Sequence, residues 1–244
     1  MKIALAAVGF KNKDINYNKN KIQSVITQLN NKADLVVFGE SFLQGFYSIK
    51  FVYKDDLKIA ITMESNVINE ISKCAKENKI AVCFGYFELY DGFIYSSQIT
   101  INKNGNIINN YRRISEGWRE KNSGPKYKEG IGFSTFALEN KKFTVGLCGD
   151  LWYQKNINKI NKIEADMVLW PVYTDYDYND WNKTEKYEYV SQTKKLNKPV
   201  LYVNSYNLDM DEKNSARAGA CFFRNGEIKA EIPAGEENIL IIEI

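Results

Sequence analysis

Lys142-Phe-Thr-Val-Gly-Leu-Cys-Gly-Asp-Leu-Trp152 is the stretch from which the rest of the chain can be interpreted. Its apolar first half predicts a buried strand over residues 143–147 that runs into a sharp turn. The turn places Cys148 between Gly146 and Gly149. Glycines let the backbone bend tightly, and small residues beside a thiol let a substrate carbonyl approach and backbone N–H groups point at a developing oxyanion. Free cysteines are also common in protein cores, so these residues alone leave a nucleophile and a structural thiol equally open.

The composition is that of a globular protein with one large core. Of 244 residues, 44% are hydrophobic and 26% are charged, so we expect a single domain over residues 1–244. The net charge of +3, without a run of basic residues, argues against a nucleic-acid partner. Residues 1–10 are apolar but lack a cleavage pattern, and no stretch is long enough to cross a membrane, so we expect no membrane association.

The chain has four cysteines and no histidine. The cysteines lie in apolar segments without Cys-x-x-Cys spacing, which favours reduced thiols in the cytoplasm over disulfides or a zinc site. The lack of histidine excludes every Ser-His-Asp, Cys-His or His-metal mechanism. A catalytic Cys148 would therefore need a carboxylate or a lysine as its base. We expect neither a metal nor a cofactor.

Hydrophobic periodicity and turn signals divide the chain into strands, helices and hairpins. Single strands are predicted over 2–10, 34–40, 79–89, 165–171, 199–204 and 238–244. Helices are predicted over 18–29, 56–78, 152–163 and 181–196. Hairpins are predicted over 93–112, 133–147 and 219–232. Two groups of buried strands, each with helices on one side, predict an α/β fold: a four-layer α-β-β-α sandwich of two mixed β-sheets.

Three of these segments end in groups that could act together. Glu40 ends an apolar strand, where a carboxylate either caps the next loop or belongs to a ligand site. Arg113 follows a hairpin strand, and Cys148 follows the strand of the opening stretch. Around them, in order, stand the motifs Phe38-Gly-Glu40, Asn110-Tyr-Arg-Arg113, Gly146-Leu-Cys-Gly-Asp150, Ala165-Asp-Met-Val-Leu-Trp-Pro171 and Tyr202-Val-Asn204. In order and spacing, over nearly the whole chain, they resemble the carbon–nitrogen hydrolase (nitrilase) superfamily.

The resemblance implies a Glu-Lys-Cys triad that hydrolyses amides, N-carbamoyl groups or nitriles through a covalent intermediate. Cys148 would be the nucleophile and Glu40 its general base, which agrees with the missing histidine. The backbone N–H of Gly149, together with a cation, would stabilise the oxyanion. The resemblance also implies a homodimer and a small amide or carbamoyl substrate.

Arg113 departs from the pattern, because the family has lysine at this position. Arginine stays protonated and cannot donate a proton near neutral pH, yet it supplies fixed charge and N–H donors. Only five of the 33 basic residues are arginines, so arginine at 113 is not a casual surface choice. The alternatives are a structural Arg113–Glu40 ion pair with hydrolysis lost, or the arrival of Lys121 or Arg119 in place of the missing lysine.

Further residues are predicted to bind substrate or shape its pocket. The resemblance implies a second glutamate after the Arg113 segment that orients substrate or water, and Glu120, rather than Glu116, is taken as this residue, the alternative being a solvated loop carboxylate. Asp150 is predicted to cap the following helix. Tyr173 begins a loop rich in aromatic and acidic residues that suits a substrate with a basic or polar amine. The predicted function is hydrolysis of a small amide or N-carbamoyl compound. The alternative is a related protein that binds such a ligand without turnover, whereas nucleotide binding lacks a glycine-rich phosphate loop.

Overall fold

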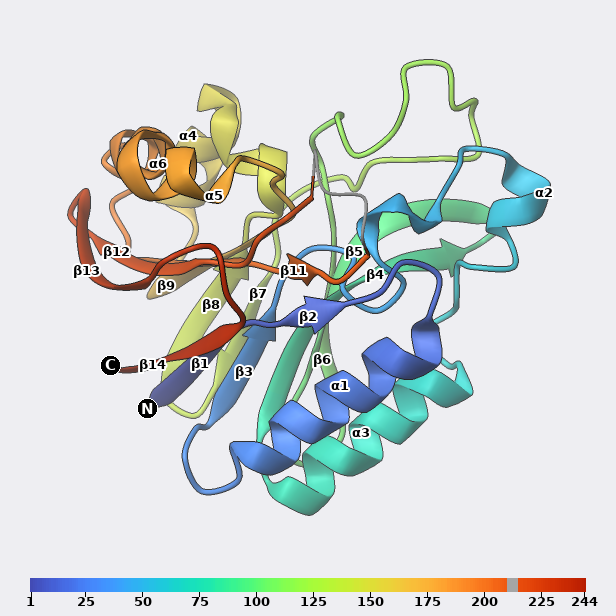
Figure 1. Ribbon diagram of the computed structural model, residues 1–244, viewed down its shortest axis with the longest axis horizontal. Helices are drawn as coiled ribbons and strands as arrows, with labels where there is room; N and C mark the ends of the chain where they lie inside the picture. The colour runs from blue at the N-terminus through green and yellow to red at the C-terminus, as the bar shows by residue number, and fades with distance from the viewer. Residues whose placement is uncertain (210–214) are drawn as a thin grey trace.

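The computed structural model describes residues 1–209 and 215–244 and contains two six-stranded sheets packed face to face (Figure 1). The first sheet, in spatial order, consists of β14 (Asn238–Glu243), β1 (Lys2–Ala7), β3 (Leu35–Phe38), β4 (Ala81–Tyr90), β5 (Phe93–Ile101) and β6 (Ile107–Arg112). The second consists of β13 (Glu227–Ile232), β12 (Ala220–Arg224), β10 (Val200–Asn204), β9 (Met167–Val172), β8 (Lys141–Val145) and β7 (Thr135–Leu138). The predicted pair of mixed sheets is confirmed.

The central strands are buried on both faces, which explains their continuous apolar sequences. In β3, Leu35 and Val37 face the second sheet, whereas Val36 and Phe38 face the outer helices. Strand β9 alternates in the same way and sends Trp170 outward. Each of these strands therefore contributes to two cores, one between the sheets and one under a helical layer.

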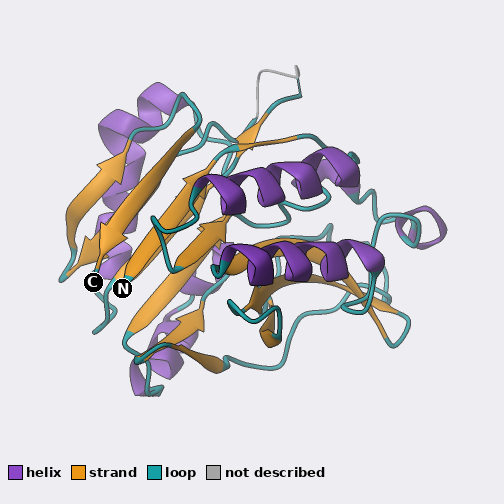
Figure 2. Cartoon of the chain, turned by 90° about the horizontal axis from the view of Figure 1, so that it is seen from below, coloured by secondary structure: helices purple, strands orange, loops and turns teal. Residues whose placement is uncertain are grey.

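Helices cover the outer face of each sheet and complete the four predicted layers. Helices α1 (Ile15–Gln28) and α3 (Asn66–Asn78) lie side by side over the first sheet (Figure 2). The second sheet is covered by α4 (Gln154–Lys162), α5 (Tyr178–Asp180), the π-helix η3 (Trp181–Glu185) and α6 (Lys186–Thr193). In the described part of the chain, no helix is long and apolar enough to cross a membrane.

Three predicted elements are divided in the structure. The predicted strand over residues 2–10 ends at Ala7, and β2 (Gly9–Phe10) leaves the sheet to pair with β11 (Tyr206–Asn207). The predicted helix over 56–78 is interrupted between α2 (Tyr53–Asp56) and α3, because Ile61 forms a bridge with β4 through bonds to Phe87 and Leu89. The predicted helix over 181–196 begins with the π-helical turn η3.

The topology brings the functional candidates to one end of the sandwich. Strands β1, β3 and β4 are parallel in the first sheet, and β8, β9 and β10 are parallel in the second. The carboxyl ends of parallel strands meet at one edge of a sheet, where open α/β sheets bind ligands. The chain termini lie beside each other, and the amino group of Met1 donates to the carbonyl of Ile244 (3.0 Å).

Candidate active site

Glu40, Arg113 and Cys148 meet at this end of the sandwich. Glu40 lies two residues beyond β3, Arg113 directly after β6, and Cys148 three residues beyond β8. Nη1 of Arg113 lies 2.9 Å from Oε1 of Glu40, and both side chains are almost completely buried, at 4% and 0% exposed. Two sheets thus supply one cluster of a carboxylate, a guanidinium and a thiol.

The elbow around Cys148 has an unusual backbone. Cys148 itself adopts a left-handed conformation (φ +45°), whereas Gly146 and Gly149 do not. The left-handed residue of the turn is therefore Cys148 and not one of the glycines. They make room instead, because an added Cβ would lie 2.4 Å from a methyl group of Leu151 at position 146 and 2.5 Å from Nη2 of Arg113 at position 149. A non-glycine residue held at positive φ is strained by about 1–3 kcal/mol, a feature that clusters at functional sites.

Neighbouring groups hold Cys148 in place from the second sheet. Its carbonyl accepts a hydrogen bond from Nε1 of Trp170 (2.8 Å), and its thiol donates to the carbonyl of Tyr173 (3.7 Å). Burial and the charge of Glu40 raise the pKa of the thiol, Arg113 opposes them, and the net pKa is about 12. The free thiol is consequently protonated at neutral pH, and attack on a carbonyl requires a base.

Glu40 has one satisfied and one unsatisfied oxygen. Oε1 accepts hydrogen bonds from Oγ of Ser96 (3.0 Å) and from Arg113. Oε2 is buried and has no hydrogen-bond partner within the described residues. The backbone of Glu40 is also tied to the second sheet, because its N–H donates to the carbonyl of Val172 (3.1 Å). An unpaired carboxylate oxygen at a fixed position is what a general base needs.

The guanidinium of Arg113 donates hydrogen bonds to three groups. Beyond the contact with Glu40, Nε donates to Oγ of Ser115 (2.9 Å) and Nη2 donates to the carbonyl of Glu116 (3.3 Å). Burial alone would lower the pKa of this guanidinium, but the charges of Glu40, Cys148 and Asp150 raise it above its ordinary value. Arg113 is therefore a permanent cation.

Asp150 joins the arginine segment to the cysteine elbow. It is fully buried, and it accepts hydrogen bonds from the backbone N–H groups of Leu147 (2.9 Å), Ile114 (3.1 Å) and Ser115 (2.7 Å) and from the Tyr111 hydroxyl (2.6 Å). The predicted cap for a following helix is too narrow a role, since Asp150 belongs to the short 3-10 turn η2 (Cys148–Trp152) and fixes two elements at once. Burial raises its pKa, and the bond from Tyr111 opposes the rise.

The two remaining predicted residues lie in different surroundings. Tyr173 is buried, its ring stacks on Phe46 at 4.4 Å, and its carbonyl accepts the hydrogen bond from the thiol. Glu120 is exposed on the loop between β6 and β7. In the same loop, Glu116 reaches Arg113 through its carbonyl. A substrate contact by Glu120 stays a prediction.

The sequence reasoning missed Ser96 and Ser115. Ser96 could have been found by extending the register of the β5–β6 hairpin, in which Ser97 pairs with Arg112. The next position places Ser96 opposite Arg113, and the N–H of Arg113 indeed donates to the carbonyl of Ser96 (2.9 Å). Ser115 gave no such signal, because its place depends on the buried Asp150.

Two curated relatives resemble part of the chain. An (R)-stereoselective amidase from a Pseudomonas species is 22% identical over 69% of this chain and 59% of its own length. A cyanide hydratase from Penicillium rubens is 27% identical over 57% of this chain and 42% of its own length. Each match thus covers less than two thirds of the relative.

Solved structures share the fold over nearly the full chain. Glutamine-dependent NAD+ synthetase from Acinetobacter baumannii matches with a TM-score of 0.82 and 21% identity, over 98% of this chain and 44% of that one. An amidase from Nesterenkonia sp. AN1, with acrylamide added at its active site cysteine, matches with a TM-score of 0.80 and 13% identity, over 100% of this chain and 93% of that one. The family model for carbon–nitrogen hydrolases matches residues 2–244. The chain belongs to the carbon–nitrogen hydrolase family.

Proposed function

We propose that this protein hydrolyses a C–N bond of a small amide or N-carbamoyl compound through a thioester on Cys148. The observation that carries the proposal is the unpaired, buried Oε2 of Glu40 beside a thiol that is protonated at neutral pH. A carboxylate with a free oxygen can take the proton of a neighbouring thiol and so activate it as a nucleophile. A purely structural carboxylate would have both oxygens bonded.

The acylation half-reaction uses all three groups. Glu40 takes the thiol proton on Oε2 while Cys148 attacks the substrate carbonyl carbon, which forms a C–S bond and a tetrahedral oxyanion. The N–H of Gly149 and the guanidinium of Arg113, which packs against Gly149, stabilise this oxyanion. When the intermediate collapses, the C–N bond breaks and protonated Glu40 returns its proton to the leaving nitrogen, which departs as ammonia or an amine.

The second half-reaction regenerates the enzyme. Glu40 removes a proton from water, the hydroxide adds to the thioester carbon, and the C–S bond breaks to release the acid. The proton held by Glu40 then returns to the sulfur. Arg113 keeps its charge throughout, so it acts by position and electrostatics and not by proton transfer.

The relatives support the reaction class but not a substrate. An amidase and a cyanide hydratase both act at a carbon–nitrogen bond, and the Nesterenkonia amidase carries its adduct at a cysteine. The second candidate function is ligand binding without turnover. The buried contact between Arg113 and Glu40 favours it, because the guanidinium already occupies one oxygen of the carboxylate, as in an ion pair that serves the fold.

We also propose a homodimer formed through the helical layer over the second sheet. Several large aromatic side chains around α4, α5 and α6 are between 37% and 54% exposed: Trp152, Tyr153, Tyr176, Tyr178 and Tyr187. Exposed aromatic clusters are typical of protein interfaces.

A panel of amides, N-carbamoyl compounds and nitriles tests the reaction. We expect ammonia release from at least one compound, loss of that release in Cys148→Ala, and an acyl adduct on the wild-type protein by intact mass spectrometry. Release equal to that of Cys148→Ala across the panel, together with ligand binding by calorimetry, would support binding without turnover and contradict hydrolysis.

A further inference from the structure

The segment after β9 runs from the catalytic thiol to the protein surface. Its first residue, Tyr173, contacts the thiol through its carbonyl. Thr174 is fixed by Asn204, whose Oδ1 accepts from the Thr174 N–H (3.2 Å) and whose Nδ2 donates to the Thr174 carbonyl (2.9 Å). Asp175, the next residue, is exposed. The segment is thus anchored at the reaction centre and presents a carboxylate two residues away.

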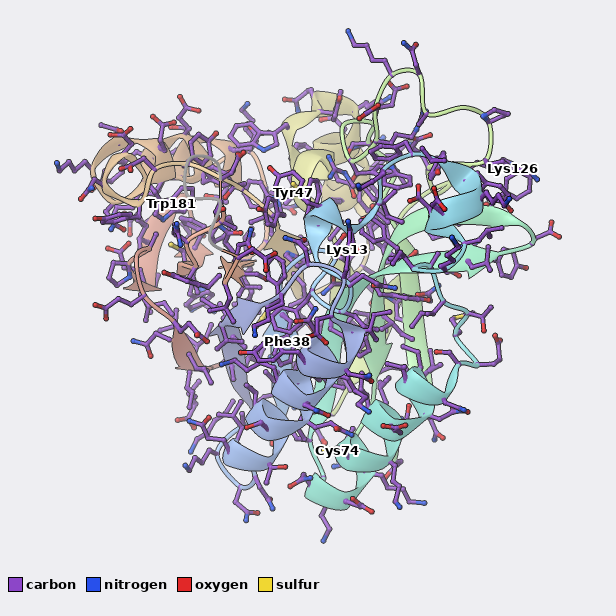
Figure 3. All side chains as sticks on the ribbon, turned by 45° about the vertical axis from the view of Figure 1, so that its right-hand side comes forward. Lys13, Phe38, Tyr47, Cys74, Lys126 and Trp181 are labelled. Atoms are coloured by element: carbon purple, nitrogen blue, oxygen red, sulfur yellow. The ribbon has the colours of Figure 1, made fainter. Side chains whose placement is uncertain are left out.

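Tyr47 supplies an aromatic surface beside this carboxylate. Its ring lies edge-on to Tyr173 at 5.4 Å, and its hydroxyl lies 3.5 Å from Oδ2 of Asp175. Figure 3 shows Tyr47 beyond the carboxyl end of β3, the strand that ends at the labelled Phe38 and leads to Glu40. Tyr47 is 47% exposed, so its ring faces both the protein and solvent.

A second aromatic group, Trp152, ends the 3-10 turn η2 that begins at Cys148. Trp152 is 40% exposed and packs on Trp170, which binds the carbonyl of Cys148. Nearby, burial raises the pKa of Tyr176, and the charges of Glu185, Glu188 and Asp175 raise it further. The pKa of Tyr47 is likewise raised by burial and by Asp175. Negatively charged carboxylates therefore lie close to both tyrosines.

The spacing sets the length of a ligand that spans the two points. Consecutive Cα atoms are about 3.8 Å apart, so the Cα of Asp175 lies within about 8 Å of that of Tyr173, and the Asp175 carboxylate lies on the order of 10 Å from the thiol that the Tyr173 carbonyl contacts. A carbonyl attacked by Cys148 and a charge four or five bonds away would occupy this distance.

We propose that Tyr47 and Asp175 form a cation subsite, and that the preferred substrate carries an ammonium or guanidinium group four or five bonds from the scissile carbonyl. This inference rests on the hydrolysis proposed above. A cation beside an aromatic ring gains about 0.5–2 kcal/mol, and a nearby carboxylate adds to the attraction. A carboxylate at the same end of the substrate would be repelled.

Three amides of equal length test the charge preference: 5-aminopentanamide, hexanamide and the monoamide of adipic acid. We expect the wild-type kcat/KM for the cationic amide to exceed that for hexanamide at least tenfold, and the anionic amide to be the poorest. Asp175→Asn should reduce the cation-to-neutral ratio by about tenfold. Glu164→Gln is the matched control, because exposed Glu164 precedes β9 at its opposite end and should leave the ratio unchanged.

The outcomes separate this inference from the proposed reaction. If hexanamide is hydrolysed as well as 5-aminopentanamide, the reaction stands and the cation subsite is wrong. If none of the three is hydrolysed, calorimetry with Cys148→Ser gives a second readout. Tighter binding of 5-aminopentanamide than hexanamide, lost in Asp175→Asn, would support the subsite and contradict turnover. Equal binding would overturn the subsite as well.

Discussion

Two consecutive arginines at the end of β6 make two different ion pairs. Arg112 binds Glu88 through two bonds, Nε to Oε2 (2.8 Å) and Nη2 to Oε1 (2.7 Å). Oγ of Ser97 adds a third bond to Oε2 (2.7 Å). The guanidinium also lies 4.1 and 4.3 Å from the ring centres of Tyr90 and Tyr95. Every oxygen of Glu88 is occupied, as in an ion pair that serves the fold.

The neighbouring pair is incomplete. Arg113 reaches only Oε1 of Glu40, and Oε2 is left without a partner in the part of the chain that the structure describes. A hollow of about 660 Å³ opens beside Arg112, and its lining contains none of the three catalytic candidates. The cavity therefore lies beside the arginine whose ion pair is complete. The incomplete ion pair belongs to Arg113, the arginine next to Cys148.

The comparison bears on whether the Arg113–Glu40 pair is inert. A buried ion pair contributes to stability only when its remaining polar atoms are also bonded, because both charges lose solvation. The Arg112–Glu88 pair meets this condition and the Arg113–Glu40 pair does not. The unpaired oxygen of Glu40 therefore supports a catalytic role over a structural one.

The largest expected effect separates the two glutamates. Glu40→Gln should lower kcat about 1,000-fold, because glutamine cannot take the thiol proton. Glu88→Gln should lower kcat less than tenfold but reduce the free energy of unfolding by about 2 kcal/mol, since it weakens a pair that is only partly exposed. Steady-state kinetics per folded molecule and urea unfolding of both variants measure the contrast. Equal losses of kcat in both variants would contradict the distinction between the pairs.

The next prediction concerns the fit between Arg113 and Gly149. Arg113→Lys should lower kcat about tenfold, because one ammonium cannot replace three fork contacts. Gly149→Ala should lower kcat about 30-fold in the wild type, where the new methyl group meets Nη2, but less than threefold in the Arg113→Lys background, a coupling within the usual range for contacting residues.

Gly146→Ala is the control for this double-mutant cycle. Its methyl group would meet Leu151 and not the guanidinium, so its effect should add to that of Arg113→Lys. Additive effects for Gly149→Ala as well would mean that Arg113 does not occupy the space beside the elbow. Full activity of Arg113→Lys would show that the arginine merely substitutes for a lysine.

The fold was largely predictable because burial and sequence period agree. Strands such as β3 and β9 are apolar on both faces, and this pattern predicts central strands between two layers. The prediction failed where a tertiary contact overrides the period. Residues around Ile61 have helical spacing, yet they pair with β4, since the strand offers backbone bonds that the sequence pattern cannot represent.

The site was predictable in its members but not in its geometry. The order of Glu40, Arg113 and Cys148 indicated that they meet, and they do. The sequence could not indicate that the positive φ falls on Cys148, because glycine is the residue expected at positive φ and a glycine follows Cys148 directly. Nor could it reveal that Asp150 joins the elbow to Ser115, since that role depends on three donors from a distant segment, Tyr111, Ile114 and Ser115.

The smallest change expected in the wild type is a nearly flat pH dependence of thiol alkylation, which distinguishes Glu40 from Glu88 without any substrate. The pKa of the Cys148 thiol is raised to about 12, so direct ionisation contributes little below pH 9. Transfer of the thiol proton to Glu40 involves no proton from solution, so the rate of Cys148 alkylation by iodoacetamide should be nearly constant between pH 7 and pH 9. In Glu40→Gln the internal acceptor is gone, and the rate should rise about tenfold per pH unit with the thiolate fraction. Glu88→Gln should keep the flat profile.

Peptide mapping separates Cys148 from the buried cysteines Cys74, Cys83 and Cys221, which we expect to react much more slowly. A tenfold rise per pH unit in the wild type would show that Glu40 does not accept the thiol proton. The unpaired oxygen of Glu40 would then have no role as a catalytic base.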